Sequence, residues 1–402
     1  MTASLRTTIL VAITAACAWQ AYRFALLPNL RLSQPAVALA QYPDDASALS
    51  RDINNRIGKT GKYATTPEDR QAAVRSLVDT PLSRSSLRII GMDKAMRGSV
   101  ADARTALGLS NRISRRDSWA QIWLLENAAR QDDSEAILNH YNAALAVTPE
   151  LAPVLNPILV KASSDREVRA ALRPYLSRDA AWAPGFLALA AKDGRLDDVM
   201  AIARPVTRQL GTDPYKPAVA QILLRLAAAG EWPEAMELAR SVWDDFDSAA
   251  FADVSPSAAS ADERLGPLAW QFGDTDGIDA TFAAGKTIEA LLSPLARGTV
   301  ATRSVPVTPG QSYQLRHRTQ FERGSEGVRI SWRADCLDAA GAASAAVWQE
   351  AVPVGFGPSV FERGFTAPAG CNLLSLTLSA TGPDGQTASV VRITNLEMRP
   401  RG

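Results

Sequence analysis

The chain of 402 residues is long enough for two or three domains, and with 47% hydrophobic and 21% charged residues it has the composition of a folded protein, which excludes a largely disordered one. Its formal net charge is +1, whereas proteins that bind phosphate backbones usually carry a strongly basic domain. We therefore expect no nucleic-acid partner.

An apolar stretch near the N-terminus predicts a membrane segment. It runs from Ile9 to Leu27, is interrupted by Gln20 and Arg23, and has the length of a single span. We predict a signal anchor or transmembrane helix over residues 1–28, which would hold the chain at the inner membrane. The alternative is a cleaved signal peptide with Ala38-Leu39-Ala40 as its site, which would leave a secreted or periplasmic protein.

Residues 29–80 are expected to form a connecting region with short helices. One helix is predicted from Ala46 to Ile57. A second is predicted from Thr66 to Val78, because a hydroxyl capping residue, proline at the first helical position and two acids in the first turn all favour a helix start. This region links the membrane segment to the part of the chain that repeats.

A six-residue pattern recurs between about Pro81 and Asp245. Each copy has small or polar turn residues, then an acid and a small apolar residue, and successive copies start 33, 32, 31 and 36 residues apart. The copies are Gly98–Ala103, Gln131–Ala136, Ser163–Val168, Gly194–Val199 and Gly230–Ala235. Turns of this kind between apolar helical segments predict an α-solenoid of helix-turn-helix repeats over residues 81–245.

The pattern resembles the tetratricopeptide repeat, whose inter-helix turn reads Gly, two or three variable residues, an acid and Ala. Gly230–Ala235 is the best match, while two of the five turns have no glycine and the first helices lack the usual Trp-Leu-Gly-Tyr set. The repeats are therefore degenerate. The resemblance implies a curved surface for a protein partner and no reaction.

After a Ser-, Ala- and Asp-rich stretch, interpreted as a linker over residues 246–264, the hydrophobic period changes to two. Tyr313, Leu315 and His317 alternate with polar residues. Apolar and polar residues alternate in the same way within residues 328–334 and within residues 374–378. Eight or nine antiparallel strands are expected over residues 265–402, in a β-sandwich of jelly-roll type with Trp332 in its core. The predicted fold class is multidomain α + β.

The last domain is similar to carbohydrate-binding modules with a jelly-roll fold. The similarity is carried by Trp270, by Val307–Tyr313 at the entry to a long strand, by Phe365–Ala369 before another, and by a closing strand over Val391–Leu396. The resemblance implies carbohydrate binding on a concave face or at loop tips. It assigns no binding residue.

Two predicted strands carry arginines on the side opposite their apolar residues. We predict that Arg316, Arg318, Arg329 and Arg333 share one face and bind carboxylate or sulfate groups of a glycan, because the guanidinium fork matches such anions. Trp348, if it shares that face, would stack on a sugar ring. The alternative is a solvated face on which these arginines form ion pairs that contribute little stability.

Three carboxylates near Gly277, those of Asp274, Asp276 and Asp279, make a structural calcium ion a candidate. Because this segment lacks the length and the bidentate glutamate of an EF-hand loop, a polar hairpin turn is the simpler interpretation. No other cofactor is expected.

The cysteines Cys336 and Cys371 both fall on predicted strands of the last domain. In a chain with an export-like N-terminus they predict a disulfide. Two buried free thiols are the alternative.

Catalysis is not expected, since His140 and His317 accompany no nucleophile elbow, HExxH helix or cysteine cluster. We expect a membrane-anchored, periplasmic adaptor of a bacterial cell envelope, whose repeats bind a protein and whose sandwich binds an envelope or extracellular polysaccharide during polysaccharide assembly or export. A purely structural protein–protein scaffold is the alternative. A polysaccharide-acting enzyme is the least favoured of the three.

Overall fold

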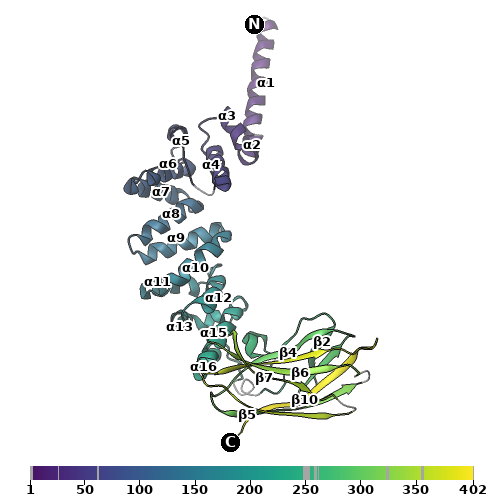
Figure 1. Cartoon of the computed structure of the whole chain (residues 1–402). Coiled ribbons are helices and arrows are strands. Elements are labelled where there is room, and N and C mark those ends of the chain that lie inside the picture. The colour runs from purple at the N-terminus through teal and green to yellow at the C-terminus, as the bar shows by residue number, and fades with distance from the viewer. Residues whose placement is uncertain are drawn as a thin grey trace. The chain divides into compact units, whose positions relative to one another are not determined.

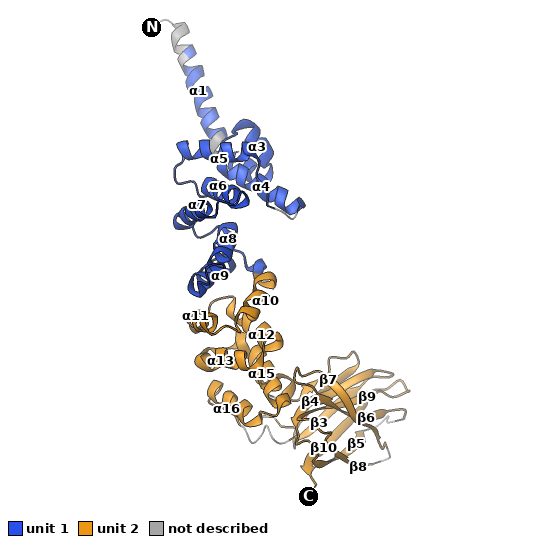
Figure 2. Ribbon diagram, turned by 60° about the vertical axis from the view of Figure 1, so that its left-hand side comes forward, with its two compact units in different colours: residues 1–151 blue, residues 152–402 orange. Residues whose placement is uncertain are grey.

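A computed structural model describes residues 3–25, 27–60, 63–247, 254–257, 260, 262–322, 326–354 and 357–401. Parts of the predicted linker, residues 248–253, 258, 259 and 261, lie outside the described residues, and so does the side chain of Arg23. The chain forms two compact units, Met1–Leu151 and Ala152–Gly402 (Figure 2). This division falls inside the predicted repeat array, so the second unit contains both helices and the sandwich.

The first unit begins with the predicted membrane segment, which is helical. It consists of α1 (Ala3–Ala25) and α2 (Leu27–Ser33), and the segment Leu10–Ser33 has the length and apolar composition of a membrane span, features that a signal sequence shares. The side chains of Leu10, Val11 and Trp19 are exposed. The alternative cleavage triplet lies within the next helix, α3 (Pro35–Gln41).

Six longer helices complete the first unit. They are α4 (Ala46–Thr60), α5 (Pro67–Asp79), α6 (Arg84–Met96), α7 (Val100–Ile113), α8 (Ser118–Ala129) and α9 (Ser134–Val147), followed by the short η1 (Pro149–Leu151). The predicted start of α5 is confirmed, because the Thr66 hydroxyl accepts a hydrogen bond from the Asp69 amide while the Asp69 carboxylate accepts one from the Thr66 amide. Consecutive helices pack as pairs, α6 with α7 and α8 with α9.

The second unit continues with helices of the same kind. They are α10 (Ala152–Ala162), α11 (Arg166–Ser177), α12 (Ala183–Asp193), α13 (Leu196–Ala203), α14 (Thr207–Leu210), α15 (Lys216–Ala229) and α16 (Trp232–Val242), with the short η2 (Arg204–Val206), η3 (Asp213–Tyr215) and η5 (Glu263–Leu268). All five predicted turns connect consecutive helices. Their residue types explain this: Gly98 and Gly230 have φ of 80° and 85°, which glycine tolerates best, while Asp133 and Asp165 accept amide hydrogen bonds at the starts of α9 and α11.

The C-terminal part is a sandwich of two antiparallel sheets (Figure 1). The strands are β1 (Gln271–Phe272), β2 (Ile278–Ala283), β3 (Thr287–Leu292), β4 (Arg297–Pro306), β5 (Ser312–Glu322), β6 (Arg329–Leu337), β7 (Ala343–Val352), β8 (Ser359–Thr366), β9 (Leu373–Thr381) and β10 (Ser389–Pro400). One sheet has the order β1-β4-β9-β6-β7 and the other β2-β3-β10-β5-β8. We call them the β6 sheet and the β5 sheet.

The sandwich core has the predicted inward residues. Leu315 and His317 from the β5 sheet face Trp332 and Leu376 from the β6 sheet, and Trp332 has 0% exposure. The expected alternation is therefore confirmed. The described residues contain ten strands, one or two more than predicted, because β2 lies where the sequence was interpreted as a turn.

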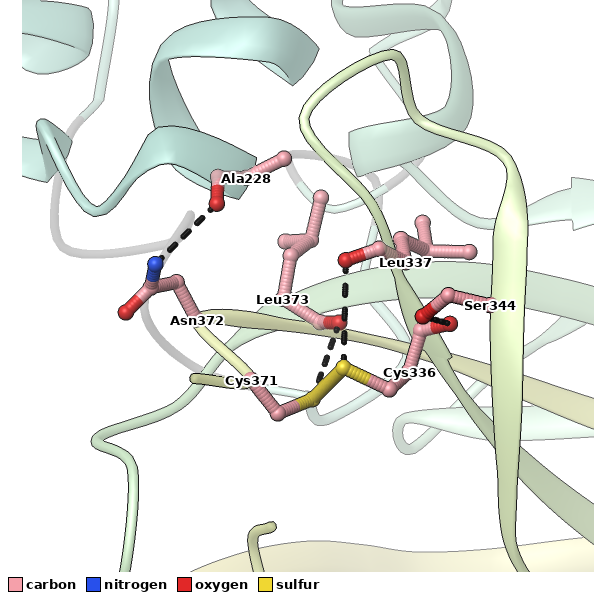
Figure 3. Close-up of a disulfide and its surroundings, with 7 residues drawn as sticks. All are labelled: Ala228, Cys336, Leu337, Ser344, Cys371, Asn372 and Leu373. Carbon is pink, nitrogen blue, oxygen red and sulfur yellow. Dashed lines mark hydrogen bonds between the residues drawn. A yellow bond between two sulfur atoms is a disulfide. The ribbon is translucent and has the colours of Figure 1, made fainter. Parts of the chain in front are cut away.

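The helices and the sandwich touch within the second unit. The Asn372 side-chain amide donates a hydrogen bond of 3.1 Å to the Ala228 carbonyl at the C-terminal end of α15 (Figure 3). The short helix η5 packs against both α15 and β4. The residue before Asn372, Cys371, forms a disulfide with Cys336 at the end of β6 (Figure 3). The segment that contacts α15 is thus covalently tied to the β6 strand.

Candidate functional site

The four predicted arginines do not share a face. Arg316 and Arg318 lie on β5 and Arg329 and Arg333 lie on β6, and these strands belong to different sheets. Each strand buries its apolar residues in the common core, so its outward side chains point away from those of the other strand. The sequence shows which side of a strand is polar, but the sheet to which the strand belongs is decided by the topology.

Trp348 lies on neither arginine face, so the condition on which its stacking role depended is not met. It is 7% exposed and its ring packs against Phe361 and Phe365 in the core. Trp348 pairs with the inward-facing Ala334, and an irregularity in the β6–β7 register follows immediately, between Ala334 and Asp335. Such a shift changes which residues of a strand point inward.

The outer face of the β6 sheet is polar and locally neutralised. Arg333 pairs with Asp335 at 2.7 Å, and the hydrogen bond to this carboxylate, with its charge, raises the pKa of Arg333 above its usual value. Ser331, next to them, pairs across the sheet with Ser379 of β9. This face presents hydroxyl groups and a paired guanidinium group, with Arg329 exposed near its end.

The outer face of the β5 sheet contains a hollow of about 400 Å³, which we call the basic hollow. Its cationic side chains are Lys286, Arg316 and Arg318, and Glu397 is its carboxylate. Ser255, Gly285, His317, Asn395 and Leu396 complete the lining. The structure thus brings together half of the predicted arginine set and adds residues that the sequence did not single out.

Cations outnumber carboxylates around the basic hollow. The cations in and beside it are Lys286, Arg316, Arg318, Arg399 and Arg401, and the carboxylates are Glu362 and Glu397. Arg316 lies directly opposite both glutamates in the strand pairing. However, Glu397 pairs with Arg399 at 2.7 Å, and Glu362 accepts a hydrogen bond from Gln314. Among the described side chains, neither Arg316 nor Arg318 forms an ion pair of its own.

The rim of the hollow contains two residues with left-handed backbone. Lys286 has φ of 56° and Asn395 has φ of 53°, and Asn395 lies where the β10 register shifts between Thr394 and Glu397. A non-glycine residue in this region costs on the order of 1 kcal/mol, and such positions cluster at functional sites. Strand periodicity could not have found them, because both lie where the alternation is interrupted.

His317 lies on the core side of β5, beneath the hollow. Its Nε2 accepts a hydrogen bond of 2.8 Å from the Trp332 indole, and its Nδ1 lies 3.2 Å from the Thr319 hydroxyl. Burial lowers the pKa of His317 to about 4, because a charged ring would lose its hydration. His317 is therefore a neutral core residue that joins the two sheets.

The structure does not gather the three predicted calcium ligands. Asp274 and Asp276 are exposed in the turn between β1 and β2, where the Ile278 amide donates to the Thr275 carbonyl, and Asp279 is exposed on β2. In the part of the chain that the structure describes, no group of three His, Cys, Asp or Glu side chains is placed to hold a metal ion. The geometry is that of a tight turn, closed by the isolated bridge between Thr275 and Ile278, and it joins strands of different sheets and not the two strands of one hairpin.

Comparison with known proteins finds no matching family model and no matching curated protein. Among solved structures, the chain is similar to a family 4 carbohydrate-binding module, with 11% identity and a TM-score of 0.27, over 35% of this chain and 92% of that one. It is also similar to the N-terminal cellulose-binding domain of β-1,4-glucanase C from Cellulomonas fimi, with 16% identity and a TM-score of 0.26, over 34% of this chain and 91% of that one.

A third similar structure is a family 61 carbohydrate-binding module in complex with β-1,4-galactotriose, with 14% identity and a TM-score of 0.24, over 37% of this chain and 99% of that one. These similarities match the C-terminal sandwich. Because the sequence identities and TM-scores are this low, these similarities do not indicate a ligand for this chain.

Proposed function

We propose that the sandwich binds an anionic polysaccharide in the basic hollow, and that the protein is a non-enzymatic, membrane-anchored adaptor of a bacterial cell envelope. The surplus of cationic side chains around a hollow of about 400 Å³ carries this proposal. Hydrogen bonds between guanidinium groups and carboxylates are roughly twice as strong as neutral ones, and the planar fork fixes their geometry.

The chemistry of the lining indicates the class of glycan. None of the described residues that line the hollow is a tryptophan, tyrosine or phenylalanine. The lining therefore offers no aromatic ring on which a sugar could stack. Arg316 and Arg318 would bind carboxylate or sulfate groups, while Asn395 and Ser255 would bind hydroxyl groups. A uronic-acid polymer, which carries both carboxylate and hydroxyl groups, fits these side chains better than a neutral glucan does.

The test measures binding of the full-length chain, in non-ionic detergent, to immobilised alginate and to neutral dextran. We expect salt-sensitive binding to alginate only, weakened roughly 10- to 100-fold by Arg316→Gln with Arg318→Gln, since each lost charged hydrogen bond is worth about 1.5–3 kcal/mol before solvent screening. The matched control is Arg329→Gln with Arg333→Gln, which removes the same charge from the β6 sheet. Equal losses in both double variants would mean that the hollow is not the site.

A second candidate function is a protein scaffold, in which the sandwich binds no glycan. The contacts of α15 with the sandwich favour it, because they give the sandwich a structural role in the second unit. In either case we propose that the helices bind a protein partner. Absence of alginate and dextran binding, with the fold intact, would favour the scaffold.

A further inference from the structure

The first unit contains a second cationic pocket, remote in sequence from the sandwich. It has a volume of about 380 Å³, within the usual range of small-ligand sites. Arg84, Arg88 and Arg116 line it, with Asp117 as its carboxylate. We call it the arginine pocket.

The central arginine of this pocket is held in place from three sides. Arg88 is 2% exposed, and its guanidinium group contacts the Asn54 amide oxygen at 3.3 Å, the Ser50 hydroxyl and the Asp117 carboxylate at 3.2 Å. A buried arginine needs such partners, because an uncompensated charge would be costly. Arg88 is therefore preorganised, and Asp117 offsets only one of the three positive charges.

The other two arginines are at the rim and are exposed. Arg84 donates to the Ser114 hydroxyl at 3.3 Å and to the Arg116 carbonyl at 3.2 Å, so it is oriented without being neutralised. Arg84 and Ser118 are the first residues of α6 and α8, so the positive ends of two helix dipoles add to the field. The pocket thus favours a negative group.

An apolar wall stands beside the arginines. Trp119, Ile122 and Leu151 line the same pocket and are half-buried, so they offer partly accessible apolar surface. A carboxylate alone would leave this wall in water. A sugar ring could stack on Trp119, but it has no aliphatic side chain to cover Ile122 and Leu151, whereas a peptide provides an acid and an apolar side chain on adjacent residues.

We propose that the arginine pocket binds an acidic peptide segment of a protein partner, with an Asp or Glu side chain or a C-terminal carboxylate between Arg84, Arg88 and Arg116 and an apolar residue on the Trp119 wall. This inference rests on the part of the proposed function that gives the helices a protein partner. It specifies the chemistry of the segment that they recognise.

The experiment selects ligands from a random display library of octapeptides with free C-termini, using the full-length chain in non-ionic detergent. Peptides enriched on the unmodified chain are expected to carry an acid next to an aliphatic or aromatic residue. Synthetic copies should bind Arg84→Gln with Arg116→Gln at least 10-fold more weakly, and the control Arg112→Gln with Arg130→Gln equally well. The single variant Arg116→Gln, whose side chain is at the exposed rim, serves if the double variant fails to fold.

Amidated copies and copies with Asn or Gln in place of the acid separate a terminal carboxylate from a side-chain one. The proposal is overturned if no acidic peptide is enriched, if the arginine variants bind the peptides as well as the control does, or if alginate displaces them from the pocket. Peptide binding should survive Arg316→Gln with Arg318→Gln, and alginate binding should survive the Arg84 and Arg116 changes. Failure of the glycan proposal and failure of this one are thus distinguishable.

Discussion

The outer faces of the two sheets carry similar residues but differ in how their charge is balanced. On the β6 sheet, Arg333 has its own carboxylate two residues away at 2.7 Å. On the β5 sheet, the glutamates opposite Arg316 are engaged by Arg399 and Gln314. Under the proposed function, arginines at alternate strand positions are not sufficient for an anion site. The proposal depends on whether the neighbouring carboxylates are already engaged by other side chains.

The two faces also differ in what fixes them. The disulfide lies at one end of the β6 sheet, between Cys336 of β6 and Cys371 just before β9, whereas the hollow is built by β5, β10 and the turn before β3. Inside the sandwich, the hydrogen bond from Trp332 to His317 connects the sheets. Changes at these positions test whether fold stability and ligand binding are separable.

The largest expected effect is that of replacing both cysteines by serine. The disulfide closes a loop with a sequence separation of 35, and the loop-entropy model gives about 4 kcal/mol for such a loop. Calorimetry should show a lower unfolding temperature for the second unit, with alginate binding of the folded protein unchanged because the hollow is on the other sheet. Loss of alginate binding in the folded variant would mean that the two faces are coupled.

The next effect is the pH dependence contributed by His317. Its pKa is about 4 in the folded protein and about 6.5 when unfolded, so the unfolded chain binds more protons below pH 6.5 and stability falls from there towards pH 4. The loss should reach about 3 kcal/mol at pH 4. In His317→Gln, which can still accept from Trp332, the fall in unfolding free energy should be smaller by this amount. Parallel pH profiles for the two proteins would contradict the assignment.

The smallest effect concerns Asp335→Asn, which removes the partner of Arg333 and makes the β6 face more like the β5 face. In the Arg316→Gln, Arg318→Gln background we expect alginate binding to increase about threefold, because the guanidinium group of Arg333 is half-exposed and solvent screens its attraction to the buried Asp335 to about 1 kcal/mol or less. Asp274→Asn is the control, since it removes one exposed carboxylate elsewhere on the sandwich. An equal increase in the control would show that net charge alone matters.

Local chemistry made much of the fold predictable. The Thr66 capping box, the glycines of the helix turns and the alternation on β5, β6 and β9 are all short-range signals, and the structure contains each of them. The additional strand β2 was missed because its first residues, Ile278 and Asp279, were interpreted as part of a polar hairpin turn.

The candidate site was only half predictable. Arg316 and Arg318 were identified from the outward side of β5, whereas Lys286 and Asn395 come from a turn and an irregular strand position, where periodicity gives no signal. The arginine pocket had no sequence signal at all. Its residues come from four helical elements and the segments between them, and only packing brings them together.

By itself, the amino-acid sequence determined the apolar N-terminal segment, the helical repeats with their turns, the inward and outward residues of the long strands, and the pairing candidates Cys336 and Cys371. These follow from periodicity and from residues whose backbone preferences act over a few positions. Only the tertiary structure decided that Arg316 and Arg329 lie on opposite faces, that Trp348 is buried, and that Lys286 lines the same hollow as Arg318. Sheet membership and register depend on contacts between residues distant in the chain, and no local pattern encodes them.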